Sequence, residues 1–402
     1  MTRRRFSDAE RRARIGARHR LAGGARASRA EEVAASLVAI HSTDPASVVI
    51  GTWARLADRA AVAAEVERAL YEERTLLRLM AMRRTMFVVD REVAPLVHAA
   101  CSLTVAARER ARTLKFLSAS GLGGRDPEGW LAGAQEAALA ALRERGEATA
   151  PEVAATDERL ASEVVVGSGK WTAPQKVASR VLLLLALEGR AVRARPRGGW
   201  TSTQFRWAAV DAWAGAPLEE LPMADAQAGL ARRWLEAYGP ARAADLQWWT
   251  GWTAAQTRKA LAAAGVVEVE LEDGAAGVVL ADDLAPVAGS GEDEQPWVAL
   301  LPALDATPMG WKHRDWYLGE HADRLFDING NVSPTVWADG RIVGGWARRP
   351  SGEVVVKILE DVGAETAAAI DAEAAALSPR LGAATLAPRA RGYSPVERDL
   401  LS

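Results

Sequence analysis

The sequence of 402 residues contains a single cysteine, Cys101. One thiol excludes a disulfide framework within the chain and suits a reducing compartment. The longest apolar run, residues 181–187, is far shorter than the roughly 20 residues that a membrane-spanning helix requires. The basic stretch 1–14 is followed by no apolar segment, so it does not resemble a secretory signal. We therefore expect a cytoplasmic protein with no membrane partner.

Motifs for metals and nucleotides are missing as well. No Walker string and no glycine-rich dinucleotide string stands between a strand pattern and a helix pattern. Zinc sites need clustered histidine and cysteine ligands, and the histidines form no close pair with one another or with Cys101; they are His19, His41, His98, His313 and His321. We expect neither a metal nor a cofactor.

Charge is balanced overall but uneven along the chain. The net charge is −2, yet residues 1–30 contain ten arginines and two acids, and residues 190–206 contain five arginines and no acid. Residues 266–294 contain nine acids and no base, and they end in Glu292, Asp293 and Glu294. Such segregation can present one basic surface to a polyanion. The alternative is that these segments are ordinary solvated faces.

Helices followed by a hairpin occur three times in the pattern, which is the order of a winged-helix motif. Hydrophobic periodicity and turn residues place the hairpins near 75–90, 191–207 and 266–281. Further strands and a helix near 364–377 follow. We predict an α+β protein with four segments: winged-helix motifs at 1–117, 129–215 and 224–290, and a β-rich region at 295–402.

A polar stretch, "HSTD" at 41–44, separates two apolar helical patterns. Val33, Leu37 and Ile40 have helical spacing, so the first helix should end near His41. Asp44 and Pro45 then provide an N-cap carboxylate and a first-turn proline for the next helix. The stretch is either a turn between helices or a reaction centre.

Four strings along the chain carry a resemblance: "LRLMAMRRTMFVV", "RRWLEAYGPARAADLQWWTGWTAAQTRKAL", "WVALLPALDATPMGWKHRDWYL" and "GNVSPTVWADGRIVGGWA". In this order they resemble the AlkZ/YcaQ-type winged-helix DNA glycosylases. The resemblance implies three tandem winged-helix motifs with a C-terminal β-rich region in a concave, DNA-gripping shape. It also implies excision of alkylated bases, including bulky N7-purine adducts and crosslinks, without a metal or cofactor.

The resemblance places the reaction centre at the polar stretch. The family motif is glutamine, a small or apolar residue, then glutamine or aspartate, followed by Asp-Pro. Here His41, Ser42 and Thr43 stand at the first three positions, while Asp44 matches. The resemblance thus implies that His41, Thr43 and Asp44 are catalytic and that Ser42 faces away. Asp305 also matches a family aspartate, for which we favour a structural role.

The chemistry of an N7-alkylated purine suits these residue types. The base already carries positive charge and leaves readily, so the enzyme must stabilise the sugar cation and hold a water. Neutral His41 can accept the proton of that water, and the Thr43 hydroxyl can orient it. Alternatively, His41 binds helix-end carbonyl groups and Asp44 is only an N-cap. No lysine lies in the stretch, so water rather than an amine should be the nucleophile.

Candidate DNA contacts lie on the first two hairpins. Arginines neutralise phosphates, and a hairpin tip can reach a groove. The candidates are Arg83 and Arg84 on the first hairpin and Arg193, Arg195, Arg197 and Trp200 on the second. The alternative is an exposed charged hairpin in each case. Tryptophans such as Trp248 and Trp249 are expected in the core.

These observations predict a monomeric, monofunctional DNA glycosylase. Its partner is double-stranded DNA with alkylated bases, and the substrate class is bulky N7-guanine adducts of a genotoxic natural product, in self-resistance or base excision repair. The alternative is a non-catalytic winged-helix protein that recognises lesions or regulates transcription. Replacement of both glutamine positions, by His41 and Thr43, favours that alternative.

Overall fold

The chain forms two compact units in the computed structural model. The structure describes residues 3–167, 172–286, 296–382, 384, 386 and 392–402. The first unit combines Met1–Glu67 with Ala228–Ser402, and the second, Arg68–Gln227, is inserted between them. The four segments predicted from the sequence stay a prediction, and the acidic residues Glu292, Asp293 and Glu294 lie outside the described residues. Among the described residues, no helix combines the length and apolar character needed to cross a bilayer.

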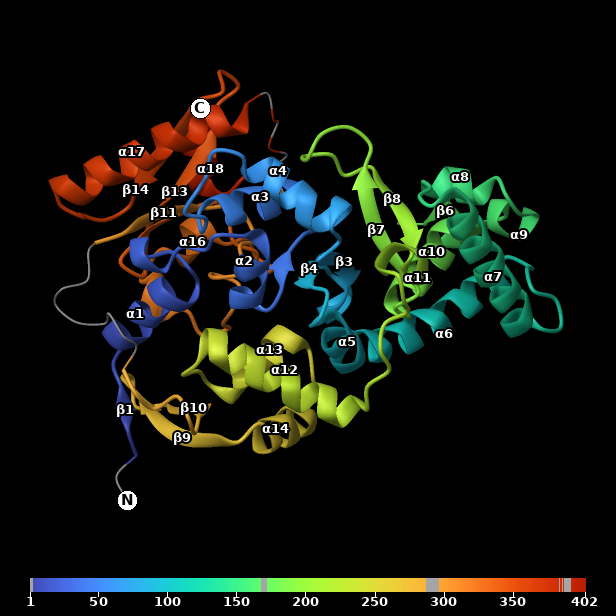
Figure 1. Cartoon of the computed structure of the whole chain (residues 1–402), viewed down its shortest axis with the longest axis horizontal. Helices are drawn as coiled ribbons and strands as arrows, with labels where there is room; N and C mark the ends of the chain where they lie inside the picture. The colour runs from blue at the N-terminus through green and yellow to red at the C-terminus, as the bar shows by residue number, and fades with distance from the viewer. Residues whose placement is uncertain (1–2, 168–171, 287–295, 383, 385, 387–391) are drawn as a thin grey trace. The chain divides into compact units, whose positions relative to one another are not determined.

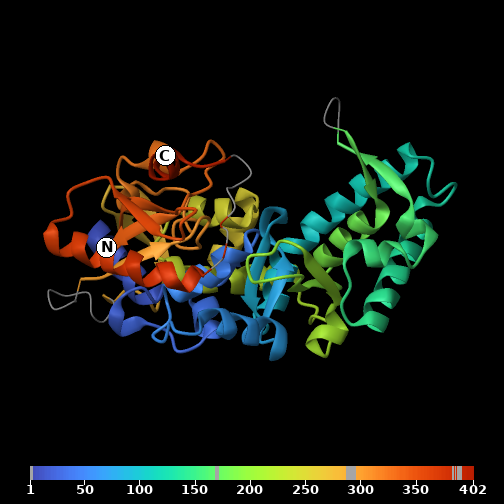
Figure 2. The ribbon, with the colours of Figure 1, turned by 90° about the horizontal axis from the view of Figure 1, so that it is seen from above.

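The first unit contains most of the helices and the largest sheet (Figures 1 and 2). Its helices are α1 (Asp8–Arg18), α2 (Ala30–Leu37), α3 (Pro45–Trp53), α4 (Val62–Glu67), most of α12 (Met223–Tyr238), α13 (Ala243–Thr250), α14 (Ala254–Ala263), α15 (Asp315–Leu318), α16 (Ala322–Leu325), α17 (Ala364–Leu381) and α18 (Pro395–Leu401). Its strands are β1 (Arg5–Phe6), β2 (Ile40–His41), β9 (Val266–Leu271), β10 (Ala276–Leu280), β11 (Val298–Leu301), β12 (Thr335–Ala338), β13 (Arg341–Arg348) and β14 (Val354–Ile358).

Strands β11 to β14 form one antiparallel sheet in sequence order. Helices α17 and α18 pack against it (Figure 1). The sheet is rich in buried aromatic residues because Trp337 and Trp346 are both fully buried. The indole nitrogen of Trp346 donates to the carbonyl of Leu301 at 2.8 Å, so its polar atom is satisfied inside the core. The predicted C-terminal strands and the helix near 364–377 are confirmed.

The third predicted hairpin is present as β9 and β10, with a strand from the far end of the sequence beside it. β1 pairs in parallel with β9, so that Arg5 lies opposite Glu270 and Phe6 opposite Leu271. Phe6 is fully buried among Val269 and Val279. Burial of Phe6 therefore adds apolar packing to the pairing of the N-terminal strand with this hairpin.

The second unit is a helical layer with three hairpins. Its helices are α5 (Ala94–Val97), α6 (Leu103–Ala119), α7 (Pro127–Arg145), α8 (Ala150–Ala154), α9 (Glu158–Ala161), α10 (Val177–Leu187) and α11 (Val210–Ala214). Its strands are β3 (Leu76–Met80), β4 (Met86–Asp90), β5 (Glu163–Val166), β6 (Ala173–Lys176), β7 (Ala191–Pro196) and β8 (Phe205–Ala209). The hairpins β3–β4 and β7–β8 confirm the prediction, whereas β5–β6 was not expected.

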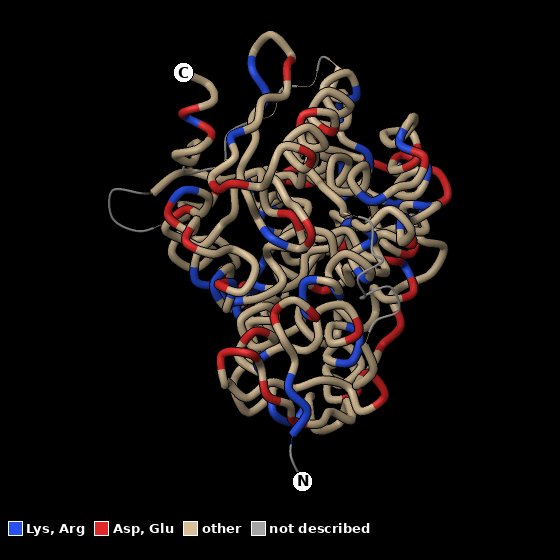
Figure 3. The backbone as a smooth tube through the Cα atoms, turned by 90° about the vertical axis from the view of Figure 1, so that its left-hand side faces the viewer, with Lys and Arg blue, Asp and Glu red and all other residues tan. Residues whose placement is uncertain are grey.

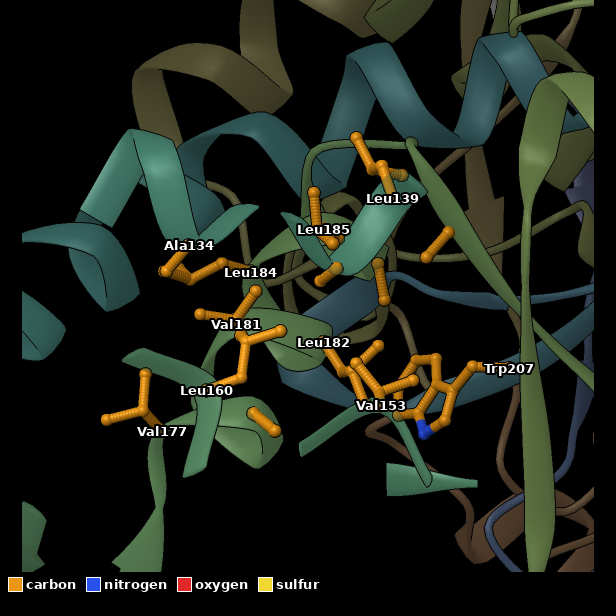
Figure 4. Packing of buried hydrophobic residues seen from close by; sticks show 14 of the residues in the cluster. Ala134, Leu139, Val153, Leu160, Val177, Val181, Leu182, Leu184, Leu185 and Trp207 are labelled. Carbon is orange, nitrogen blue, oxygen red and sulfur yellow. The ribbon is translucent and has the colours of Figure 1, made fainter. Parts of the chain in front are cut away.

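Helix α10 is the centre of the second unit's core. Nine of its eleven residues are buried, which agrees with the all-apolar sequence of 181–187. Figure 4 shows Leu182, Leu184 and Leu185 of α10 among side chains from the surrounding elements, including Trp207 of β8. This core includes residues of β7 and β8 and so holds in place the hairpin that carries the arginines.

The basic and acidic segments of the first unit pair with each other. Arg5 faces Glu270 at 3.7 Å, and Arg3 pairs with Glu268. Arg14 and Arg18 both bind the carboxylate of Asp283, at 2.9 and 2.5 Å. Figure 3 shows basic and acidic segments side by side near the N-terminus. A basic surface with an acidic back is therefore wrong for this part of the chain, because β1 and α1 lie against the acidic hairpin.

Candidate functional site

The polar stretch 41–44 connects α2 to α3 in the first unit. Helix α2 ends at Leu37, and Val38 follows with φ of 64°, a conformation that a β-branched residue rarely adopts. The predicted helix end near His41 is thus wrong by four residues, and His41 lies in the two-residue strand β2. The side chain of His41 is half-buried, that of Ser42 is buried, and that of Thr43 is exposed. His41 and Thr43 are thus both more exposed than the residue between them, and Thr43 lies in a bend that follows β2.

Asp44 caps α3. One carboxylate oxygen accepts a hydrogen bond from the Ala46 backbone N–H at 3.0 Å. The Ser47 hydroxyl lies 3.2 Å from the other oxygen and 2.8 Å from the carbonyl of Ala303. The structural N-cap role considered for Asp44 is therefore present. Its carboxylate also stays half-buried beside the polar stretch.

A small cavity of about 40 Å³ adjoins the Asp44 carboxylate. It has room for a few water molecules and is far too small for a base. Its polar lining comes from the N-cap of α3, from the sheet, from the segment before α18 and from α18 itself, namely Asp44, Arg348, Tyr393 and Glu397. The cavity can therefore hold water next to Asp44.

A buried ion pair anchors α3. The Arg55 guanidinium donates to both carboxylate oxygens of Asp305, at 2.7 and 2.9 Å, and neither side chain reaches solvent. Arg55 also donates to the Gly51 carbonyl at 2.7 Å. A Cβ at Gly51 would lie 3.0 Å from an Asp305 oxygen, so a larger residue there would crowd the ion pair. Asp305 therefore has the structural role that the sequence analysis favoured.

His19 extends this network in its neutral form. Its Nδ1 lies 2.8 Å from the Thr307 hydroxyl, which itself accepts from Arg55 at 2.8 Å. Its Nε2 lies 3.1 Å from the Ala237 carbonyl, which can only accept, so the proton is on Nε2. Burial, together with the charge of Arg55, lowers the pKa of His19 to about 3. His19 is thus a neutral structural link rather than a reactive base.

The tip of the first hairpin carries two exposed arginines. Arg83 and Arg84 have φ of 53° and 62° between β3 and β4, so the tip is a tight turn that projects both side chains outward. Arg84 binds a carboxylate oxygen of Glu109 at 3.1 Å. Glu109 is itself buried and also binds Arg180 at 3.0 Å.

The arginines of the second hairpin have no acidic neighbours in the sequence, but in the fold glutamates from other segments pair with them. The pairs join each arginine to a distant glutamate: Arg190 to Glu136 at 2.6 Å, Arg195 to Glu72 at 3.8 Å, Arg206 to Glu147 at 3.2 Å, and Arg197 to Glu152. Exposed pairs of this kind contribute little and exchange readily. Trp200 is half-buried in the turn between β7 and β8.

Arg193 differs from its neighbours. Its guanidinium stacks on the ring of Trp207 at 3.9 Å, and within the described residues it pairs with no carboxylate. Burial, with a further contribution from the charge of Arg78, lowers the pKa of Arg193 to about 10, so it stays charged at neutral pH. It lines an open cleft of about 560 Å³ together with Gln175, Arg197 and Gln204. This cleft is thus a polar recess beside two candidate DNA-contacting residues, Arg193 and Arg197.

The two neighbouring tryptophans that were expected in the core differ in exposure. Trp249 is buried in the core as expected, whereas Trp248 is half-buried with the Arg314 guanidinium 4.9 Å from its ring.

In the described part of the chain, no group of three or more histidine, cysteine, aspartate or glutamate side chains could hold a metal ion. The expected independence from metals stays a prediction.

Arg55 was missed by the sequence analysis. The sequence did contain a signal for a buried charge, because a lone arginine inside the apolar run 45–56 must find a partner if it is buried. Its partner, 250 residues away, has no local sequence signal.

Comparisons with known proteins bear on the whole chain. The profile of a family described as DNA glycosylase AlkZ-like matches residues 34–379. Among solved structures, the DNA glycosylase AlkZ of Streptomyces sahachiroi is similar, with a TM-score of 0.68 and 21% sequence identity. The match covers 93% of this chain and 97% of that one. No protein with curated annotation matches the sequence.

Proposed function

This chain belongs to the AlkZ-like DNA glycosylase family, and we propose that it is a monofunctional enzyme that hydrolyses the N-glycosidic bond of alkylated purines. Water attacks the anomeric carbon, the bond to the purine nitrogen breaks, and its electron pair leaves with the base. The products are a free base and an abasic site. Because N7 alkylation already places positive charge on the purine, departure of the base needs little further protonation.

One observation carries this proposal. The family match includes the stretch 41–44, and this stretch has a half-buried imidazole and an exposed hydroxyl two residues apart. A water between them would meet one proton acceptor and one orienting hydroxyl. We assign His41 as general base and Thr43 as the residue that orients the water. Asp44 holds the start of α3 and places a negative charge near the developing sugar cation.

DNA contact is assigned to the second unit. Arg83 and Arg84 are exposed at one hairpin tip, and Arg195 and Arg197 make only weak surface pairs that phosphates can replace. Arg193 supplies a charge without a carboxylate partner among the described residues, at the wall of an open cleft. Part of the same proposal is that the three helix–hairpin series are winged-helix motifs and that the enzyme acts as a monomer in the cytoplasm.

The substrate class is a bulky N7-guanine adduct, such as one made by a genotoxic natural product, in self-resistance or base excision repair. A bulky adduct distorts the duplex, so an enzyme that binds an open surface need not take the base into a tight pocket. The 40 Å³ cavity beside Asp44 suits this reasoning because it accommodates water only.

The test is an excision assay. Duplex DNA with one bulky N7-guanine adduct is incubated with excess protein, and abasic sites are cleaved by alkali and resolved on a gel. Cleavage at the adduct, absent with undamaged DNA, is the expected result. Tight, adduct-dependent binding without abasic sites would instead identify the non-catalytic alternative, a lesion-recognition or regulatory protein.

A further inference from the structure

A second recess in the inserted unit is lined by three arginines. This recess, of about 330 Å³, is lined by the end of α7, the start of β8 and the segment around α11. Its lining residues are Arg74, Arg145, Gly146, Glu147, Arg206, Ala212 and Trp213. All of them lie within Arg68–Gln227. We call it the arginine recess.

The charge of the arginine recess is unbalanced. Three guanidinium groups face a single carboxylate, Glu147, which pairs with Arg206 at 3.2 Å. Within the described residues, neither Arg74 nor Arg145 makes an ion pair with an acid. The lining therefore carries a net positive charge, which favours an anion.

Arg74 is held in place before any ligand arrives. Its guanidinium stacks on the Trp213 ring at 4.0 Å and donates to the Trp213 carbonyl at 3.0 Å. Its Nε is buried and has no hydrogen-bond partner among the described residues. A fixed guanidinium loses little conformational entropy when it binds, and its planar donors match phosphate oxygens.

The lining favours a phosphate over a base. Stacking would need a free aromatic face, but Trp213 is 5% exposed and is covered by Arg74. No asparagine or glutamine is among its lining residues, so the side chains that pair with an adenine edge are missing from it. Arginine binds phosphate oxygens through two parallel N–H donors.

We propose that the arginine recess binds a phosphodiester group of the DNA backbone through Arg74, Arg145 and Arg206. It is separate from the hairpin-tip residues assigned above. This inference rests on the proposed function for the identity of the polyanion. Free inorganic phosphate offers the same chemistry, and the experiment distinguishes the two sources.

The experiment compares two exposed arginines two positions apart on α7. Arg145→Ala removes a recess arginine, and the matched control Arg143→Ala removes one that is already paired with Asp211 at 2.7 Å and does not line the recess. Affinity for an undamaged duplex is measured at several salt concentrations. Arg145→Ala should weaken binding about three- to tenfold at low salt and lower the salt slope by about 0.9. Arg143→Ala should leave both values unchanged.

Further measurements separate the alternatives. Equal effects of the two substitutions, or none from Arg145→Ala, would overturn the proposal. Submillimolar binding of inorganic phosphate to the wild type, with a DNA salt slope that Arg145→Ala does not change, would overturn the DNA assignment in favour of free phosphate. Excision is measured at saturating protein in the same variants. Failure of excision in the wild type would count against the proposed function alone, because the salt slope does not depend on catalysis.

Discussion

Arg55 and Asp305 are 250 residues apart in the sequence and form a two-pronged ion pair that is sealed from solvent. The pair fastens α3 to the segment that follows β11. The N-cap of α3 is Asp44, so the position of the polar stretch 41–44 depends on this distant contact. A change at Asp305 should therefore act on stability first and on the candidate site through it.

Asp305→Ala should destabilise the protein by about 3–5 kcal/mol, because it leaves the Arg55 charge buried without a partner. Urea unfolding at neutral pH measures the loss. The control is Arg232→Ala, which breaks an exposed pair with Asp282 and should leave the free energy of unfolding close to that of the wild type. Equal stability of the two variants would show that the buried pair contributes nothing.

His41→Ala should lower the single-turnover excision rate by something like 10²–10⁴-fold, since the proton acceptor is lost. The wild-type rate should fall as the pH drops, because protonated imidazole cannot accept a proton. His41→Gln restores the residue usual in the family and should keep measurable activity without the low-pH limb. Thr43→Val should reduce the rate while DNA binding persists.

The control for these variants is DNA affinity. A collapse of binding would indicate a damaged junction between α2 and α3 rather than lost chemistry. If His41→Ala and Thr43→Val both excise the adduct at the wild-type rate, the stretch is only a turn and the assignment is wrong.

Replacing Arg193, Arg195 and Arg197 together by alanine should weaken DNA binding and flatten its dependence on salt, because the slope falls by about 0.9 for each phosphate that the variant no longer binds. Arg193 packs on Trp207, so its replacement also weakens the packing of the hairpin. The double variant Arg195→Ala/Arg197→Ala avoids this complication and should show a smaller change in the same direction. Salt titrations that superimpose on the wild type would discard the hairpin assignment.

The buried His19 should make the protein less stable in mild acid. Its pKa in the folded protein is about 3 against an ordinary value of 6.5, so between these values the unfolded chain binds a proton that the folded chain does not. Stability should therefore fall as the pH drops from about 6.5 towards 3, by at most roughly 1.4 kcal/mol per pH unit from this residue. His19→Asn, which cannot titrate, should flatten that dependence in urea unfolding series. His98, whose pKa burial also lowers, adds to the wild-type slope.

Excision should persist in excess chelator. The spacing of the five histidines and Cys101 in the sequence motivates this expectation. A loss of activity that added zinc restores would overturn the metal-free mechanism.

Local patterns in the sequence predicted the elements well where neighbours along the chain decide the structure. The hairpins β3–β4, β7–β8 and β9–β10 follow from apolar runs around turn residues. Helix α2 was predicted too long because Val33, Leu37 and Ile40 keep helical spacing. The backbone leaves the helix at Val38 with a positive φ, for which no glycine or asparagine gives a signal.

Partners from distant parts of the chain could not be predicted. β1 joins β9 through residues such as Arg5 and Glu270, and no local pattern specifies that pairing. The run 190–206 contains no acid, yet Glu72, Glu136, Glu147 and Glu152 reach its arginines in the fold. Sequence charge patterns describe what one segment carries, whereas the field at a surface depends on every segment that meets there.

The insertion of one unit within the other sets an order of events during synthesis. Residues 41–44 leave the ribosome early, but the contact that fixes α3 waits for Asp305, which is synthesised 250 residues after Arg55. At about 5–20 residues per second, this delay is on the order of tens of seconds. The inserted unit, Arg68–Gln227, is complete well before then and has its own core. A nascent chain should therefore contain a folded basic hairpin before its candidate reaction centre has formed.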